Sequence, residues 1–426
     1  MFFQFFLLDD ARLQKHRISF AFCPKSCYDD KDKTCNHGKE NIFIQRKRKA
    51  GTTMNPNLKK YALSELPHYK VHGRTIPKAS PLPLFFNGSG VEVNVSGSEL
   101  WVDLEVSYHV FEMWIACEIN GELMSRQMLM PGTYPLCLFR GMSEEPIKNV
   151  RIYRELQAMS EDEDCCLIVH GFQTDGSFSP VPEKKLTLEF IGDSITSGEG
   201  TYGAKEDWDW IPMYMSYSRN YAKMTAEALD ADTFMISQGG WGVLSAWDNN
   251  PDSNIPSRYE KLCDLCYGEK NKALGAFEPY DFSLRQVDAV IVNLGTNDAS
   301  AFEQPPFINP VTGESFKQRK NADGTYNEDD LNRFKDAVVN FLKMLRRHNP
   351  QAHIVWCYGM LGYNLNAAIT DAMNRYTKET GDHNLRYLQL PNTTRETIGS
   401  HEHPGELSHR RAADVLIEYL RDYFAV

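Results

Sequence analysis

The sequence predicts a three-layer α/β domain built on a parallel five-stranded sheet, preceded by a β-sandwich. Within residues 186–426, apolar strand-like runs alternate with amphipathic helical stretches. This order is typical of parallel strands joined by helical crossovers. Residues 64–176 instead show short alternating runs separated by turns, a pattern typical of an antiparallel sandwich. The chain length of 426 residues is compatible with two or three domains.

The β-sandwich is predicted from period-two patterns. Residues 90–95 and 100–106 alternate apolar and polar side chains, and residues 114–119 run into Asn120-Gly121, a strong hairpin signal. Further strands are expected at residues 134–139, 148–153 and 166–170. Pro180 and Pro182 resist regular strand pairing, so residues 177–184 are predicted to be the linker to the second domain.

The strands of the α/β domain are predicted from five apolar runs. Helices are expected at residues 217–229 and 328–347, the second with Asn327 as N-cap, and around Leu416 near the C-terminus. The five strands are expected at residues 186–191, 233–237, 289–294, 354–358 and 386–390. Ligands bind at the carboxyl ends of the strands in such sheets. Residues that follow these strands are therefore the candidates for a functional site.

The N-terminal region and the overall charge narrow the class of protein. Residues 1–60 lack periodicity and are predicted to be a poorly ordered extension, with Met54 as the natural start. The first ten residues lack a basic region and turn acidic at once, so they are a poor secretion signal and favour the cytoplasm. No run of 18 apolar residues predicts a membrane span. The net charge of −11 disfavours a nucleic-acid partner.

Polar residues that follow the predicted strands supply the parts of an acyl-transfer site. Ser194 suits the nucleophile, and His403 suits the base that takes its proton. The oxyanion donors are expected to be the N–H groups of Ser194 and Gly240 and the side-chain amide of Asn297. Asp193 and Asp298 are expected to brace loops, whereas His401 and His409 compete with His403 for the role of base. All of these residues except His409 come from Gly192-Asp193-Ser194, Gly239-Gly240-Trp241, Gly295-Thr296-Asn297-Asp298 and His401-Glu402-His403-Pro404.

These four segments resemble, in order, the conserved blocks of the SGNH, or GDSL, hydrolases. The resemblance covers residues 186–426 and assigns the base to His403, because Pro404 follows it. Residues 71–160 are similar, in strand rhythm, to the first domain of carbohydrate esterase family two. This second resemblance implies a jelly-roll module and a reaction that removes acetyl groups from sugar hydroxyls.

One position departs from the pattern of the superfamily. Many SGNH enzymes have Asp three residues before the histidine, whereas this chain has Ser400. Either a backbone carbonyl or one of the carboxylates of Glu402 and Glu406 is then expected to orient the His403 ring. A degenerate, inactive site is the remaining alternative.

The favoured function is a serine esterase acting on acetylated carbohydrates or related small esters. The alternatives are an acyltransferase, lipase or thioesterase using the same site, and an inactive carbohydrate-binding protein. No cofactor is expected, because the chain has no phosphate-binding Gly-rich loop. No metal is expected, because Cys263 and Cys266 have no second ligand pair. The oligomeric state is not predicted. The candidates for lining the substrate site are Trp241, Trp356, Tyr358 and Trp208.

Overall fold

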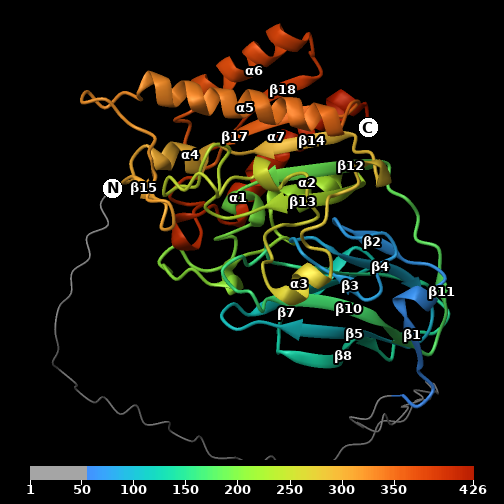
Figure 1. Ribbon diagram of the computed structural model, residues 1–426. Coiled ribbons are helices and arrows are strands. Elements are labelled where there is room, and N and C mark those ends of the chain that lie inside the picture. The colour runs from blue at the N-terminus through green and yellow to red at the C-terminus, as the bar shows by residue number, and fades with distance from the viewer. Residues whose placement is uncertain (1–54) are drawn as a thin grey trace, which may run out of the picture. The chain divides into compact units, whose positions relative to one another are not determined.

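The computed structural model of this chain describes residues 55–426 (Figure 1). These residues belong to one compact unit. Most of the extension predicted at residues 1–60 lies outside the described residues, and strand β1 (Lys59–Ala62) begins within that range. Within residues 55–426, no helix has both the length and the apolar character needed to cross a membrane.

The N-terminal part consists of two antiparallel sheets that share one apolar core. The prediction of β-structure is confirmed, but its strands extend beyond residues 64–176 on both sides; jelly-roll connectivity stays a prediction. The first sheet contains β1, β3 (Leu82–Pro83), β5 (Glu99–Ser107), β8 (Gly132–Arg140) and β10 (Cys166–Thr174). The second contains β2 (Lys70–His72), β4 (Gly90–Val95), β6 (Met113–Ile119), β7 (Glu122–Leu129), β9 (Lys148–Arg154) and β11 (Phe178–Ser179).

The C-terminal part contains the predicted five-stranded sheet, and all of its strands are parallel. The strand order is β13-β12-β14-β17-β18, so β12 lies between β13 and β14 (Figure 1). The strands are β12 (Leu186–Gly192), β13 (Ala231–Ser237), β14 (Ala289–Asn293), β17 (His353–Gly359) and β18 (Leu385–Leu390). The predicted strand positions are therefore confirmed to within two residues at each end.

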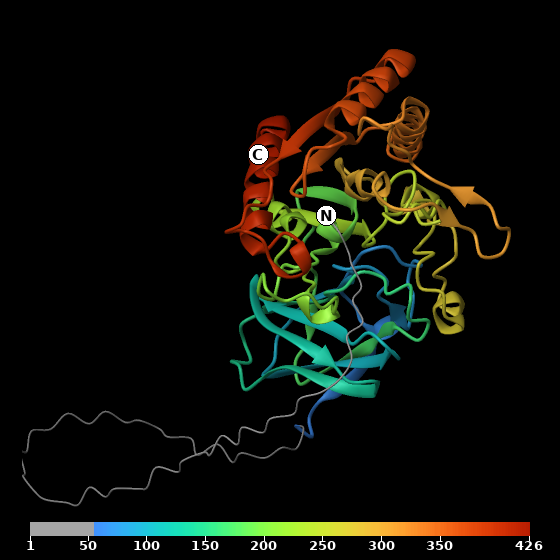
Figure 2. The ribbon, with the colours of Figure 1, turned by 90° about the vertical axis from the view of Figure 1, so that its left-hand side faces the viewer.

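Helices cover both faces of this sheet. One face packs against α5 (Glu328–His348) and α6 (Asn366–Thr380), and the other packs against α2 (Tyr221–Ala228) and α7 (Glu406–Phe424). Figure 2 shows α7 and α5 on opposite sides of the strands. Asn327 caps α5 as predicted, because its side chain accepts a hydrogen bond from the Asp330 N–H. Helix α6 was not predicted.

Shorter elements connect the strands. The short α-helices are α1 (Ser194–Ser197), α3 (Glu269–Ala273) and α4 (Thr296–Ala301), and β15 (Phe307–Ile308) pairs with β16 (Ser315–Phe316). Single 3₁₀ turns occur at Leu63–Glu65, Pro212–Tyr214, Pro256–Arg258, Phe282–Leu284 and Ser400–Glu402.

Buried ion pairs join the β-rich part to the α/β part. The Arg74 guanidinium lies 3.0 Å from the Glu189 carboxylate of β12, and the Lys223 ammonium of α2 lies 2.8 Å from the Glu118 carboxylate of β6. Removing one partner of such a pair strands a buried charge. These contacts therefore fix the β-rich part against the sheet that carries the candidate site.

Candidate active site

Ser194 stands where β12 ends and α1 begins. The Asp193 side chain caps this short helix by accepting a hydrogen bond from the Ile195 N–H at 3.0 Å. Gly198 follows in a left-handed conformation with φ of 81°, and this turn reverses the chain directly after the helix. The local sequence thus presents the Ser194 hydroxyl at the carboxyl edge of the sheet.

His403 reaches Ser194 from the segment before α7. Its Nε2 lies 2.9 Å from Ser194 Oγ, and its Nδ1 lies 2.7 Å from the carbonyl oxygen of His401. If Nδ1 donates its proton to that carbonyl, Nε2 is free to accept the serine proton. The close approach requires Gly200, because a Cβ at that position would lie 2.5 Å from the His403 Cβ. The two residues predicted as nucleophile and base therefore meet in one site.

The sequence left open whether a backbone carbonyl, Glu402 or Glu406 orients the His403 ring. The backbone carbonyl of His401 occupies this position, whereas the Glu406 carboxylate accepts hydrogen bonds from Arg219 at 2.9 and 3.0 Å. A carboxylate that was not predicted also lies nearby. Glu199 Oε1 is 2.8 Å from His401 Nδ1 and 3.5 Å from His403 Nδ1.

Glu199 is buried, with 5% of its surface exposed. Burial alone would raise the pKa of its carboxyl group. The charge of His403 and the hydrogen bonds from His401 and Trp210 outweigh burial and hold this pKa below its usual value. The hydrogen bond to Glu199 in turn raises the pKa of His401 above 6.5. The only signal in the sequence was an acidic residue in a turn otherwise made of small residues, five positions after Ser194.

Among residues 55–426, Glu199, His401 and His403 form a group that could hold a metal ion, since their donor atoms lie within 4.8 Å of one another. Both ring nitrogens of His403 already have partners in Ser194 Oγ and the His401 carbonyl. A metal ion bound to either nitrogen would displace one of these contacts. We therefore interpret the cluster as a proton-transfer site.

The predicted oxyanion donors lie in two loops. Within the described part of the chain, neither the Ser194 N–H nor the Gly240 N–H donates to a protein acceptor, so both are available to a ligand. Asn297 Nδ2 lies 2.9 Å from the Trp241 carbonyl and 3.3 Å from the Asp193 carboxylate. For Asn297 to serve as a third donor, the longer contact to Asp193 would have to open.

Asp193 and Asp298 brace this region. Asp298 accepts hydrogen bonds from the backbone N–H groups of residues 243–245 at 2.8 to 3.3 Å. Complete burial raises the pKa of Asp193 to about 7 and that of Asp298 to about 6. A partly protonated Asp193 places less negative charge beside the oxyanion donors than an ordinary aspartate would.

The β-rich part contributes a contact to the loop of residues 238–242 after β13, which contains Gly240 and is called the oxyanion loop below. Gln157, which follows β9, accepts a hydrogen bond from the Gly239 N–H at 2.7 Å and is 1% exposed. Gly239 directly precedes the predicted donor Gly240. No local sequence pattern predicts this contact, because it joins residues 82 positions apart.

The aromatic predictions are partly wrong. Trp356 is fully buried, and its indole N–H donates to the Leu294 carbonyl; Tyr358 is 2% exposed. Both belong to β17, which helices cover on both faces, so neither lines a substrate site. Trp241 is also buried, at 9%.

Two other tryptophans expose their rings. Trp208 is 59% exposed, so it remains a candidate for lining the site. Trp247, which was not predicted, is 49% exposed; its backbone N–H donates to the Gly240 carbonyl, and its ring lies 3.1 Å from where a Gly240 Cβ would be. Trp247 therefore borders the oxyanion loop.

The other two candidate histidines have different surroundings. His409 is completely buried, and burial, with the charge of His403, lowers its pKa to about 3. Its Nδ1 accepts a hydrogen bond from the Tyr221 N–H at 3.3 Å. His401 bonds to Glu199, whereas His403 alone of the three contacts Ser194.

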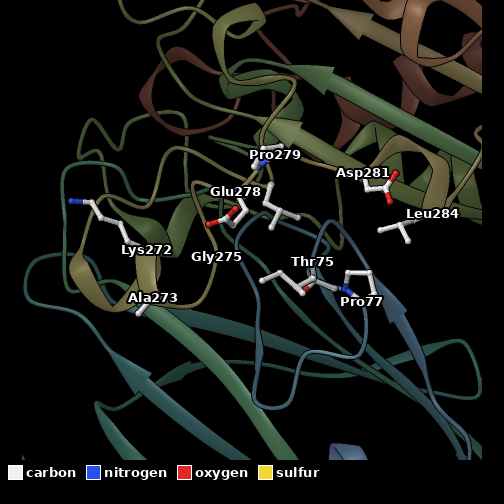
Figure 3. A pocket seen from close by; sticks show the side chains of 11 residues that line it. Thr75, Pro77, Lys272, Ala273, Gly275, Glu278, Pro279, Asp281 and Leu284 are labelled. Atoms are coloured by element: carbon white, nitrogen blue, oxygen red, sulfur yellow. The ribbon is translucent and has the colours of Figure 1, made fainter.

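A separate cavity of about 420 Å³ contains none of the predicted site residues (Figure 3). It lies between the Thr75–Pro77 segment and residues of the 262–284 region. Its side chains include Lys272, Glu278 and Asp281, and neither Ser194 nor His403 lines it.

Comparisons with known proteins agree with the geometry. The model of the GDSL-like lipase/acylhydrolase family matches residues 190–411. The structure is similar to Est2A, an acetyl xylan esterase from the rumen bacterium Butyrivibrio proteoclasticus. The TM-score is 0.85 and the sequence identity 55%, and the match covers 86% of this chain and 99% of that chain.

Two curated proteins are more distant relatives. The cellulase/esterase CelE of Acetivibrio thermocellus is 25% identical over 343 residues, which are 79% of this chain. This chain spans only 37% of the length of CelE. An acetylxylan esterase / glucomannan deacetylase of Cellvibrio japonicus is 24% identical over 367 residues, covering 83% of this chain and 88% of that protein.

Proposed function

We propose that this chain, a carboxylic ester hydrolase that belongs to the GDSL-like lipase/acylhydrolase family, removes acetyl groups from O-acetylated carbohydrates. Acetylated xylan is the leading substrate. The relative that is 55% identical is an acetyl xylan esterase. The exposed rings of Trp208 and Trp247 are suited to stacking on a sugar.

In the proposed mechanism, Ser194 Oγ attacks the carbonyl carbon of the acetyl ester while its proton passes to His403 Nε2. The oxyanion of the tetrahedral intermediate accepts hydrogen bonds from the N–H groups of Ser194 and Gly240. The sugar oxygen then leaves with the proton held by His403. Water attacks the acetyl-serine, His403 takes one of its protons, and acetate departs as Ser194 regains its hydroxyl.

The observation that carries this proposal is the 2.9 Å contact between His403 Nε2 and Ser194 Oγ. The position of the His401 carbonyl supports it, because a donor interaction at Nδ1 leaves Nε2 as the basic nitrogen.

The test is acetate release from acetylated xylan. Ser194→Ala is expected to lower the rate by roughly a thousandfold or more, as removal of the nucleophile does in other serine hydrolases. Ser197→Ala is the matched control, because Ser197 lies on the same short helix but bonds to Ser237 Oγ. Equal rates for wild type and Ser194→Ala would refute the proposal.

The chain length of the acyl group separates the alternatives. A series of p-nitrophenyl esters is expected to give the highest kcat/KM for acetate. A maximum at octanoate would instead indicate a lipase or thioesterase, and faster ester formation than hydrolysis in the presence of an acceptor alcohol would indicate an acyltransferase. Failure of a fluorophosphonate to label Ser194 would indicate an inactive, carbohydrate-binding protein.

A further inference from the structure

We propose that Glu199 is the acidic positioning residue of this site, and that its carboxylate both stabilises the protonated ring of His403 and holds the backbone that orients this ring. The inference rests on the proposed function and adds a residue to it. The carboxylate arrives from the loop after the nucleophile, since the position three residues before His403 is Ser400, whose hydroxyl donates to the Tyr202 carbonyl at 2.9 Å.

The first step of the argument concerns charge. When His403 Nε2 takes the serine proton, its ring becomes cationic, and the His401 carbonyl offers only a dipole to Nδ1. Glu199 Oε1 lies 3.5 Å from that nitrogen and is shielded from water. An opposite charge within about 4–6 Å favours the charged form of its neighbour by a factor of roughly 10 to 1000. A buried carboxylate here therefore stabilises the state through which proton transfer passes.

The second step concerns the backbone. His401 adopts a left-handed conformation with φ of 51° and ψ of 37°, which is uncommon for a residue with a side chain. This conformation directs its carbonyl to His403 Nδ1. Two contacts hold it, the 2.8 Å bond between Glu199 Oε1 and His401 Nδ1 and the 2.7 Å bond from the His401 N–H to the Asp207 carbonyl. One carboxylate oxygen thus acts on His403 directly and through the residue that orients it.

The third step concerns the charge state of Glu199. Its pKa is held below the usual value, so the group is ionised at neutral pH and is available as a counter-charge. Several other titratable groups face Glu199 and the two histidines and contribute to the local potential. They are Asp193 at the end of β12, Glu402 beside His401, and His409 from α7.

The experiment compares Glu199→Gln with wild type in the kinetics of acetyl ester hydrolysis between pH 5 and pH 9, with circular dichroism to check folding. Loss of the charge is expected to lower kcat by roughly 10- to 100-fold, with KM within about twofold, and to move the acidic limb of the pH–rate profile to lower pH. Glu199→Asp, which keeps the charge, is expected to retain more activity than Glu199→Gln. Glu402→Gln is the matched control, because it removes a neighbouring charge whose carboxylate is not among the partners of the His403 ring, which are Ser194, the His401 carbonyl and Glu199.

A second measurement does not depend on turnover. In a Ser194→Ala background, the titration midpoint of the His403 ring, followed by nitrogen NMR, is expected to fall by about one unit or more in Glu199→Gln. An unchanged midpoint, a wild-type pH–rate profile in Glu199→Gln, or an equal effect of Glu402→Gln would overturn the role of Glu199. Absence of Ser194-dependent acetate release from wild type would instead overturn the proposed function, and the NMR titration would still decide the role of Glu199.

Discussion

The contact between Gln157 and Gly239 predicts that a residue outside the α/β domain controls the rate of the reaction. Gln157→Met keeps a side chain of similar length but removes the oxygen that accepts the Gly239 N–H at 2.7 Å. The Gly239 N–H is partly buried, and leaving a buried donor unpaired costs about 1–3 kcal/mol. If the loop relaxes instead, the neighbouring Gly240 N–H moves out of line with the oxyanion, where one donor is typically worth about 2.7–4 kcal/mol.

We base the expected effect on the smaller range, about 1–3 kcal/mol, because a displaced Gly240 N–H keeps part of its interaction with the oxyanion. A loss of 1–3 kcal/mol corresponds to a decrease in kcat of roughly 5- to 150-fold. KM for p-nitrophenyl acetate is expected to stay within about twofold, since this small ester does not rely on the loop for binding.

The assay is steady-state hydrolysis of p-nitrophenyl acetate. Ser160→Ala is the control, because Ser160 Oγ contacts the Gln238 side chain at 3.4 Å and does not bond to the backbone of the oxyanion loop. A kcat for Gln157→Met within twofold of wild type, or an equal loss in Ser160→Ala, would refute the reasoning.

Three further predictions follow from burial and exposure. Trp247→Ala is expected to raise KM for acetylated xylo-oligosaccharides about three- to tenfold, with little change in kcat; an unchanged KM would exclude stacking on this ring. His409, whose pKa is about 3 in the fold, stays neutral while the unfolded chain binds a proton below about pH 6.5. The free energy of unfolding should therefore decrease by about 3 kcal/mol as the pH is lowered from 6.5 to 4, and by less in His409→Asn. An equal decrease in wild type and in His409→Asn would contradict this. Arg74→Met should cost about 3–5 kcal/mol in urea unfolding by stranding Glu189, and adding Glu189→Gln should recover a large part; no recovery would argue against the pair.

The sequence was a good guide to the α/β part because four of its five strands, β12, β13, β14 and β17, are almost entirely buried. These four strands are short, mainly apolar runs, and the four motif segments lie directly after strands or before the last helix. Parallel pairing brings such segments to one edge of the sheet. This is why Ser194 and His403, more than 200 residues apart, were expected to meet.

The wrong and missing predictions concern residues whose positions depend on loop conformation or on packing between layers. Trp356 and Tyr358 were predicted to line the substrate site because they lie near the end of a strand, but both belong to β17 itself and are buried. Loop conformations and contacts between the two parts of the chain bring three further residues to the site, and the local sequence pattern does not predict them. They are Glu199, Gln157 and Trp247. Helix α6 (Asn366–Thr380) was missed because no side-chain cap marks its start.

The choice between a hydrolase that forms an acyl-enzyme and a protein that merely binds esters depends on one covalent bond. Brief incubation with p-nitrophenyl acetate, acid quenching and peptide mass spectrometry tests for it directly. The peptide that contains Ser194 is expected to carry one added acetyl group in wild type and none in Ser194→Ala. An acetyl group found at another residue, or none under conditions where p-nitrophenol is released in a burst, would contradict the account.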